Sequence, residues 1–401
     1  MTGHERFMTG RPGGKRASLR FADLSELDLS RRDLTDGDFS GSSFDSCNMI
    51  GVRMIRAALF GCSFRRADLR HAVLNRADIR GSCLRGANLS GADLTEADFR
   101  EGQIAIPHPG KGLDVIRHEV RDGEVDKANF TGATLTGSNF NGVSAFAADF
   151  TDCAMKNVKM SGANMKDANL SGAMVDGVDF AGANMQGVVF AGAVLTGVDI
   201  ERLRGMGGNM AQCIGESTAD EAAIADMLQR AHDNKQWCES GARSGRPACF
   251  DGEDLRSLGS GLRGLMLTAM SAKGACMVGL DLTGAQLQGA NLEGADLRGA
   301  VLVGADMRGA RLIGANLTKA DLRKVNLSAL PLGPDRVAAS PMNAARLRYA
   351  IIRGADLSRV ILDDADLSGA DLTGSMLKGV SLRGADLTGT VGLEFGREAA
   401  A

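Results

Sequence analysis

The sequence predicts an all-β solenoid, in which the chain winds repeatedly around an apolar axis. Three observations support this fold class. A large apolar residue, called here the centre of a repeat, recurs at every fifth position over most of the chain. A small residue stands two positions before most centres, often with an Asp or Asn between them. The two residues that follow a centre have turn chemistry, as in Ser90-Gly91.

A spacing of five fits neither an α-helix, with its period of about 3.6, nor a plain strand, with its period of two. Residues two apart in an extended segment point to the same side, so the small residue and the centre both face inward. One repeat alone cannot bury its centre, whereas stacked repeats can. The centres are apolar without exception over residues 19–104, 130–200, 277–327 and 347–387.

Several repeats resemble those of the pentapeptide-repeat family, namely Ala92-Asp93-Leu94, Ala295-Asp296-Leu297, Ala315-Asn316-Leu317 and Ala365-Asp366-Leu367. The resemblance covers about two thirds of the chain. It implies a right-handed quadrilateral parallel β-helix with four pentapeptides in each coil, so that residues twenty apart are stacked. Phe44 should then lie under Phe64, and Phe130 under Phe150. An outer ladder should run through Asp28, Asn48, Asp68 and Asn88.

Taken in order, residues 1–16 should be disordered or form an N-terminal cap. Residues 17–202 should form an N-terminal solenoid with a loop insertion at 105–125. The insertion contains Pro107 and Pro109, which favour a loop. The step from Ile104 to Phe130 is one residue longer than five repeats, so this segment is a true insertion. Within it, residues 113–120 could pack on the solenoid as a short strand or helix.

The repeat is expected to stop from Glu201 to about Gly245, so that residues 203–249 form a small α-helical insert between two solenoid halves. Thr218 and Glu221 have the spacing of a capping box. Trp237 should lie just beyond the helix and anchor it against a coil. A structural cap and spacer is favoured over a helix edge that recruits a partner. The apolar face of the helix should contain Ile224, Met227, Leu228 and Ala231.

Residues 250–390 should form the C-terminal solenoid. Its spacing slips near Leu255, Leu262 and Leu267. The loop 328–343 should replace part of a coil, because the centres on either side of it remain in phase. Residues 391–401 form a C-terminal cap or tail. An open solenoid end must be covered or paired, so Val391, Leu393 and Phe395 could plug the end or supply a dimer contact.

The net charge of −3 argues against a strongly basic protein, and no direct nucleic-acid binding is expected. No apolar run is long enough to cross a bilayer, and the start of the chain lacks the apolar segment of a secretory signal. We therefore expect a cytoplasmic protein without a membrane partner. None of the eight cysteines forms a CxxC pair. Cys47, Cys62 and Cys153 occupy small positions and should be buried thiols.

The sequence contains no catalytic motif, no phosphate-binding loop and no zinc-spaced cluster of Cys and His. His108 and His118 lack partners at metal-ligand spacing. Regularly spaced, solvated Asp residues are not desolvated as acid–base catalysis requires. The expectation is therefore a protein that is not an enzyme, with no catalytic residues, no cofactor and no metal ion.

The favoured function is that of a structural or interaction protein, a rigid rod that binds an unknown protein partner through its surface or inserts. Loops on rigid scaffolds commonly carry binding. An end-to-end homodimer is a further partner arrangement to test. The candidate partner-binding residues are Pro107, His108, Arg117, His118 and Trp237.

The alternative is a DNA-mimic modulator of DNA gyrase, because the quinolone-resistance members of the family resemble B-form DNA and bind gyrase as end-to-end dimers. A DNA mimic needs a negative field. Residues 250–401, however, contain 17 acidic and 17 basic residues, and the helical insert is a further departure from the smaller members. A third alternative, catalysis by the 201–249 insert, has no nucleophile–base pair to support it.

Overall fold

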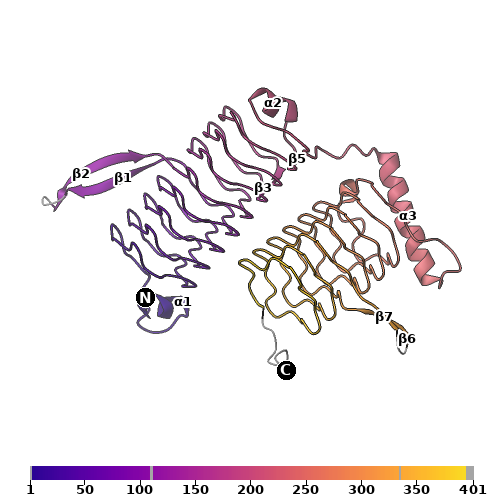
Figure 1. Cartoon of the computed structure of the whole chain (residues 1–401). Helices are drawn as coiled ribbons and strands as arrows, with labels where there is room; N and C mark the ends of the chain where they lie inside the picture. The colour runs from indigo at the N-terminus through magenta and orange to yellow at the C-terminus, as the bar shows by residue number, and fades with distance from the viewer. Residues whose placement is uncertain (1, 109–111, 334–335, 394–401) are drawn as a thin grey trace. The chain divides into compact units, whose positions relative to one another are not determined.

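The computed structural model describes residues 2–108, 112–333 and 336–393, apart from the side chains of residue 2 and residues 104–120 (Figure 1). The chain divides into two compact units, Met1–Glu216 and Ser217–Ala401. Both units are built from the five-residue repeat, and in each the chain forms stacked β-helical coils (Figure 1).

Parallel backbone bridges join residues twenty apart along most of both units. In the first unit, Asn48 is bridged to Asp28 on one side and to Asp68 on the other. The Asn48 N–H donates to the Leu27 carbonyl at 3.0 Å, and the Leu29 N–H donates to the Asn48 carbonyl at 2.7 Å. Each outer residue thus pairs its backbone with the preceding coil, which confirms the predicted outer ladder.

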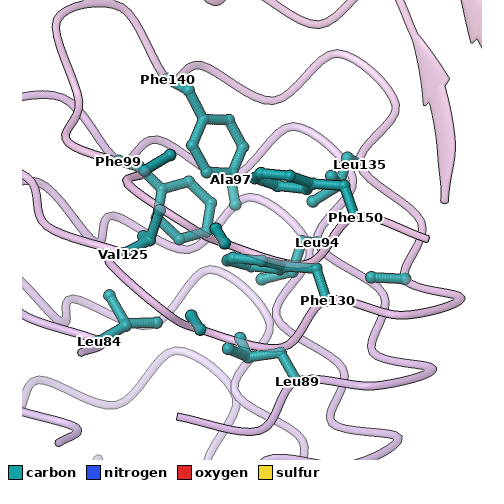
Figure 2. Packing of buried hydrophobic residues seen from close by; sticks show 14 of the residues in the cluster. Leu84, Leu89, Leu94, Ala97, Phe99, Val125, Phe130, Leu135, Phe140 and Phe150 are labelled. Carbon is teal, nitrogen blue, oxygen red and sulfur yellow. The ribbon is translucent and has the colours of Figure 1, made fainter. Parts of the chain in front are cut away.

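The small residues and centres fill the axis of each unit with one continuous apolar cluster. The Phe44 and Phe64 rings stack with centroids 5.0 Å apart, and the Phe130 and Phe150 rings stack at 4.9 Å. These contacts confirm the predicted stacking. Figure 2 shows Phe130 and Phe150 in the core together with Phe99.

The first unit begins with helix α1 (Thr2–Met8). Its His4 is buried, and the backbone ladder starts shortly afterwards with the bridge between Ser18 and Asp38. Helix α1 therefore precedes the first coil directly and lies against it.

The insertion in this unit is a β-hairpin in which β1 (Gly102–His108) pairs antiparallel with β2 (Gly112–Arg121). Residues 113–120 are therefore a strand. Ile104, predicted to be a centre, instead belongs to β1, and the centre that follows Phe99 is Val125. Ile104 keeps the five-residue spacing because an apolar residue of the inserted strand stands at the position where the next centre would fall.

Further along the unit, a parallel three-stranded sheet contains β3 (Ala154–Lys156), β4 (Met174–Asp176) and β5 (Val194–Thr196). Helix α2 (Ile200–Gly205) follows, and the Asp199 side chain caps it by accepting from the Arg202 N–H at 2.9 Å.

The repeat does not stop at Glu201, as the sequence had suggested. Asn209 is bridged to Val189, and Ile214 to Val194, so the coil resumes after α2 at an unchanged spacing of twenty. Ile200, predicted to be a centre, begins α2 instead. Helix α2 takes the place of two repeats without changing the number of residues in the coil. The apolar centres before and after it therefore keep their five-residue spacing, and the spacing gives no sign of the helix.

The second unit begins with helix α3 (Glu221–Glu239). Its N-cap is Asp220, whose side chain accepts from the Ala223 N–H at 2.8 Å. The predicted cap at Thr218 is wrong because Asp220, a strong capping residue, lies closer to the helix. Trp237 lies inside α3 rather than beyond it. The predicted apolar face is confirmed, since its four residues all contact the core of the second unit.

The slipped spacing at the start of the second solenoid has a local cause. The 3₁₀ helix η1 (Arg256–Leu258) adds two residues to the first coil, so Asp254 is bridged to Cys276. Despite the slip, Leu255, Leu262 and Leu267 are all fully buried.

A second hairpin, β6 (Leu330–Gly333) with β7 (Arg336–Ala338), occupies the predicted loop 328–343. It does not replace part of a coil. Asn316 is bridged to Arg346 and Asn326 to Asp356, so the hairpin is added to a complete coil. The replacement was predicted because an insertion of ten residues equals two whole repeats, so the centres on either side of it stay in phase.

At the C-terminal end, Val391 is bridged to Asp371, so the ladder continues beyond residue 390. Leu393 packs partly buried against the core, and Phe395 lies outside the described residues. None of the helices in the described segments is both long enough and apolar enough to span a bilayer.

Candidate interaction surface

The hairpin of the first unit leaves its coil after Phe99 and is fixed at its base by close contacts. The Arg121 guanidinium, at the end of β2, donates from Nη1 to the Gly61 carbonyl at 2.8 Å. A Cβ atom on Gly81 would lie 3.2 Å from the Arg121 carbonyl oxygen, and one on Gly102 would lie 2.4 Å from the Phe60 ring. The two glycines therefore allow the hairpin base to lie against the coil.

The coils continue across the hairpin. Cys83 is bridged to Glu124, 41 residues further on, and the Phe99 and Phe140 rings stack with centroids 4.2 Å apart (Figure 2). The hairpin thus projects from a solenoid whose core is uninterrupted. The base of the hairpin is thus fixed on its own unit.

An ion-pair cluster joins the coil residues that precede the hairpin to those that follow it. The Arg85 guanidinium donates from Nε to Glu124 Oε1 at 2.7 Å, and the Cys83 thiol donates to Glu124 Oε2 at 3.2 Å. Burial opposes ionisation of Glu124, but these hydrogen bonds outweigh it and lower the pKa of the carboxyl. Burial raises the pKa of Cys83, and the neighbouring Glu124 charge adds to this effect. Glu124 is therefore a carboxylate and Cys83 a neutral thiol at neutral pH.

Two polar hollows adjoin the hairpin base. The first has a volume of about 600 Å³ and the second about 540 Å³. In the second, Arg80 lies over the Phe60 ring at 5.5 Å. Both hollows combine guanidinium groups with carboxylates, which suits a polar partner that offers both signs of charge. The first is lined by Cys62, Ser63, Arg65, Gly81, Cys83, Arg121, Asp122, Glu124 and Ser144. The second is lined by Arg80, Arg100, Glu101, Asn141 and Gly142.

The structure brings four of the five predicted partner-binding residues onto this hairpin. In its register, Pro107 pairs with Ile116 and His118 with Ala105. His108 is also in β1, and Arg117 in β2. The side chains of these four residues lie outside the described part of the chain. Trp237 is separated from them because it is a half-buried residue of α3 in the other unit.

Sequence reasoning missed the polar residues by which α3 covers the first coil of the second unit. Inside a solenoid, the carbonyl of each ladder residue accepts from the preceding coil. The first coil has no predecessor, and α3 supplies donors instead. Arg230 Nη1 donates to the Cys249 carbonyl at 2.6 Å, and the Cys238 thiol lies 3.8 Å from the Met266 carbonyl.

Asn234 lies between these two residues on α3 and is fully buried. Its Nδ2 donates to the Thr268 carbonyl at 3.1 Å, and its Oδ1 accepts from the Ala248 N–H at 2.8 Å. Arg230, Asn234 and Cys238 are four residues apart and so lie on one helix face. The four-residue spacing could have indicated that the three residues share a buried face, but polar helix residues are ordinarily predicted to face solvent.

The outer surface of both units is lined by ion pairs formed within single repeats. In the pair Asp68–Arg70, Nη2 and Oδ2 are 2.7 Å apart, and the hydrogen bond to Asp68 raises the pKa of Arg70. Such pairs neutralise the outer Asp residues locally. The other pairs of this kind include Asp78–Arg80, Asp98–Arg100, Asp254–Arg256, Asp296–Arg298, Asp306–Arg308 and Asp321–Arg323.

The buried cysteines are structural. Cys47, Cys62 and Cys153 are buried at small positions, as predicted. The Cys62 thiol donates to the Phe39 carbonyl of the preceding coil at 3.1 Å, and burial raises its pKa to about 12. Within the described residues, no group of three or more His, Cys, Asp or Glu side chains is placed to hold a metal ion.

Comparison with models of known protein families supports the five-residue repeat. The family model described as pentapeptide repeats matches more than half of the chain. No curated protein gives a significant match. The matched segments are residues 15–51, 53–91, 72–103, 126–162, 163–202, 271–302, 290–328, 342–379 and 350–389.

Among solved structures, the chain is similar to HetL, a pentapeptide repeat protein involved in heterocyst differentiation regulation from the cyanobacterium Nostoc sp. strain PCC 7120. The identity is 19%, the match covers 96% of this chain and 94% of HetL, and the TM-score is 0.15. A second match is QnrB1, a plasmid-mediated fluoroquinolone resistance protein, with 20% identity, coverage of 53% and 99%, and a TM-score of 0.27. At these scores neither likeness supports an argument about shape or function.

Proposed function

The chain belongs to the pentapeptide-repeat family, and from this premise we propose that it is a non-enzymatic interaction protein that binds a protein partner through the β1–β2 hairpin. The observation that carries this proposal is the mounting of the hairpin. The coils stack across it, with Phe99 on Phe140, while Arg121 fixes its base. A rigid scaffold that holds a projecting element in place is a common arrangement for binding.

The proposal extends to the architecture of the rod. We propose that each unit is a right-handed quadrilateral solenoid with four pentapeptides in each coil. The spacing of twenty between bridged residues supports this, because twenty residues correspond to four repeats of five.

The chain offers a clean deletion to test hairpin-dependent binding. Removing residues 102–122 reduces the separation of Cys83 and Glu124 from 41 to twenty residues, which is the ordinary coil spacing. The shortened chain should therefore fold. Affinity capture with tagged protein, quantified by mass spectrometry, should show loss of the partner that the intact chain retains.

A matched control removes residues 329–338, which hold the β6–β7 hairpin of the second unit, so that the separation of Asn316 and Arg346 likewise falls to the ordinary twenty residues. This variant should keep the partner. Circular dichroism should confirm that both variants retain the folded spectrum. Equal capture of the same partner by all three proteins would overturn the assignment to the β1–β2 hairpin.

The alternative, a DNA-mimic modulator of gyrase, receives less support from the surface. A mimic of DNA needs a continuous negative field, whereas the outer Asp residues are neutralised by arginines of the same repeats. A supercoiling assay with purified gyrase and excess protein decides between the two. Inhibition would favour the alternative, and unchanged supercoiling would remove it.

A further inference from the structure

The coil that precedes helix α2 lacks part of its backbone pairing. One coil earlier, the Met160 N–H donates to the Asp179 carbonyl at 2.8 Å, and the Asp179 N–H donates to the Val158 carbonyl at 3.0 Å. Opposite α2 this pattern stops, and within the described residues six backbone groups have no backbone partner. They are the N–H groups of Phe180, Gly182, Met185 and Gly187 and the carbonyls of Val178 and Ala183. A stretch of the ladder edge is therefore open.

A hollow of about 180 Å³ lies at the same place. It is lined by residues 178–181 of the coil and by residues of the segment that contains α2, among them Arg202 and Leu203. Phe180 is 6% exposed there, whereas Met160, in the same position one coil earlier, is 0% exposed. Helix α2 thus covers this edge without replacing the missing part of the coil.

The sequence of the α2 segment follows the pattern of the repeat at most of its positions. Val198-Asp199-Ile200 has the order of small residue, Asp and apolar centre that Val178-Asp179-Phe180 has one coil earlier. Leu203 would fall at a small position, and that position accepts leucine, since Leu280 occupies it in the second unit and is 1% exposed. The length also fits, because Asn209 is still bridged to the residue twenty before it. The segment is thus compatible with a coil form, in which it would add two repeats.

Gly205 is the position at which the pattern fails. It stands where a centre is required, twenty residues after the buried Met185, and has no side chain to fill the apolar axis. In the coil form this would leave a cavity over Met185, and such a cavity destabilises a core. In the observed form, Leu203 enters the core from α2 instead and is only 3% exposed. The missing centre therefore favours the helix.

We propose that residues 198–207 are a switch segment with two conformations. In the observed conformation they hold helix α2. In the other, the coil form, the backbone of Asp199 pairs with that of Asp179. Arg204 pairs with Asn184 in the same way, and all six open backbone groups gain partners. The two conformations use the same residues and exclude each other, so any change that fills the missing centre shifts the balance toward the coil form.

A single substitution tests the proposal. Gly205→Leu supplies the missing centre, and it is also tolerated in α2, because a Cβ atom at Gly205 would meet no atom of another element within 4 Å. Hydrogen–deuterium exchange on the intact chain, read at single amides, reports the pairing. In the original chain, the amides of Phe180 and Met185 should exchange rapidly. In the variant they should gain protection of roughly tenfold or more, as expected for newly formed backbone hydrogen bonds.

Gly205→Gln is the matched control. Glutamine has about the same helix propensity as leucine, but burying its amide at a centre would cost the hydrogen bonds of that group. The amides of Phe180 and Met185 should therefore stay unprotected. Those of Met160 and Met165 are paired in both conformations and show whether the unit remains folded. The proposal fails if Gly205→Leu leaves Phe180 and Met185 unprotected or exposes Met160 and Met165, or if Gly205→Gln protects Phe180 and Met185 equally.

Discussion

The residue two positions after a centre carries the left-handed turn of the repeat. Gly192 has φ of 67°, and Ala147, in the equivalent position of another repeat, has φ of 52°. A side chain costs about 1–2 kcal/mol in this conformation. Many repeats tolerate that cost, since residues such as Arg76 and Lys127 also have positive φ values.

Glycine-to-alanine and alanine-to-glycine substitutions at this position should therefore change the free energy of unfolding in opposite directions. A Cβ atom at Gly192 would meet no atom within 4 Å, so Gly192→Ala isolates the backbone term and should destabilise the fold by about 1 kcal/mol. Ala147→Gly relieves strain and should not destabilise it, because the relief offsets the greater freedom of glycine in the unfolded chain. Urea unfolding of both variants measures the difference. Equal losses of stability would contradict this account.

The cysteines should divide by reactivity. Cys249 is exposed, whereas Cys47, Cys62 and Cys153 are buried. Because the thiolate is the reactive form, burial that raises the pKa of Cys62 to about 12 makes it inert at neutral pH. Iodoacetamide at pH 8 should modify Cys249 in the folded protein and leave the other three intact. Modification of all four in denaturant is the control. Labelling of Cys62 at the rate of Cys249 would show that its site is open.

At the scale of the elements, helix α3 covers the first coil of the second unit and supplies the hydrogen-bond donors that a preceding coil would provide. Asn234→Ala should destabilise the second unit by about 2–4 kcal/mol, because it leaves the buried Ala248 N–H and the partly buried Thr268 carbonyl without partners. Gln236→Ala, at an exposed position of the same helix, should change stability by less than about 0.5 kcal/mol. Urea unfolding measures both, and similar small effects would mean that α3 is not a cap.

The repeat could be predicted from the sequence because every centre must be apolar, and the elements that escaped prediction are those that leave this rule intact. Helix α2 occupies the residues of two repeats, so Ile200 keeps the apolar phase while beginning a helix. The β6–β7 hairpin adds ten residues and leaves the phase unchanged. The β1–β2 insertion was detected because it shifts the phase by one residue.

The candidate site was only partly predictable for a related reason. Proline and glycine marked the β1–β2 segment, but the contacts that fix it depend on residues distant in sequence, such as Gly61 and Arg121. No local pattern encodes such a pairing. In the same way, Asn234 could be recognised as a capping residue only once the backbone groups facing it were known.

For the whole molecule, the ion pairs along the coils imply a defined loss of stability in acid. Burial opposes ionisation of Asp98 and Asp306, but hydrogen bonds from Arg100 and Arg308 outweigh it and lower the pKa of both carboxyls below 3.8. The unfolded chain then binds more protons than the folded one as the pH falls below about 4. The free energy of unfolding should be constant near pH 6 and fall progressively below pH 4.

Urea unfolding between about pH 6 and pH 3 measures this dependence. Replacing Asp98 and Asp306 together by Asn removes two of the titrating groups and should flatten the acid limb. An unchanged slope in the double variant would show that these pairs do not contribute.

The two ends of the second solenoid differ in a way that predicts self-association. Helix α3 covers the first coil, whereas in the last described coil Met376 is 57% exposed and the centres Leu377, Leu382 and Leu387 are only partly buried. An open solenoid end presents apolar side chains together with unpaired backbone groups, and a second copy offers both in complementary form. We therefore expect an end-to-end homodimer through this coil.

Light scattering after size-exclusion chromatography should give about twice the chain mass of 41.9 kDa. Met376→Lys should shift the protein to monomer, while Leu332→Lys, at a residue 55% exposed on β6, should leave the dimer intact. A monomer at every concentration, or a dimer unaffected by Met376→Lys, would exclude this contact.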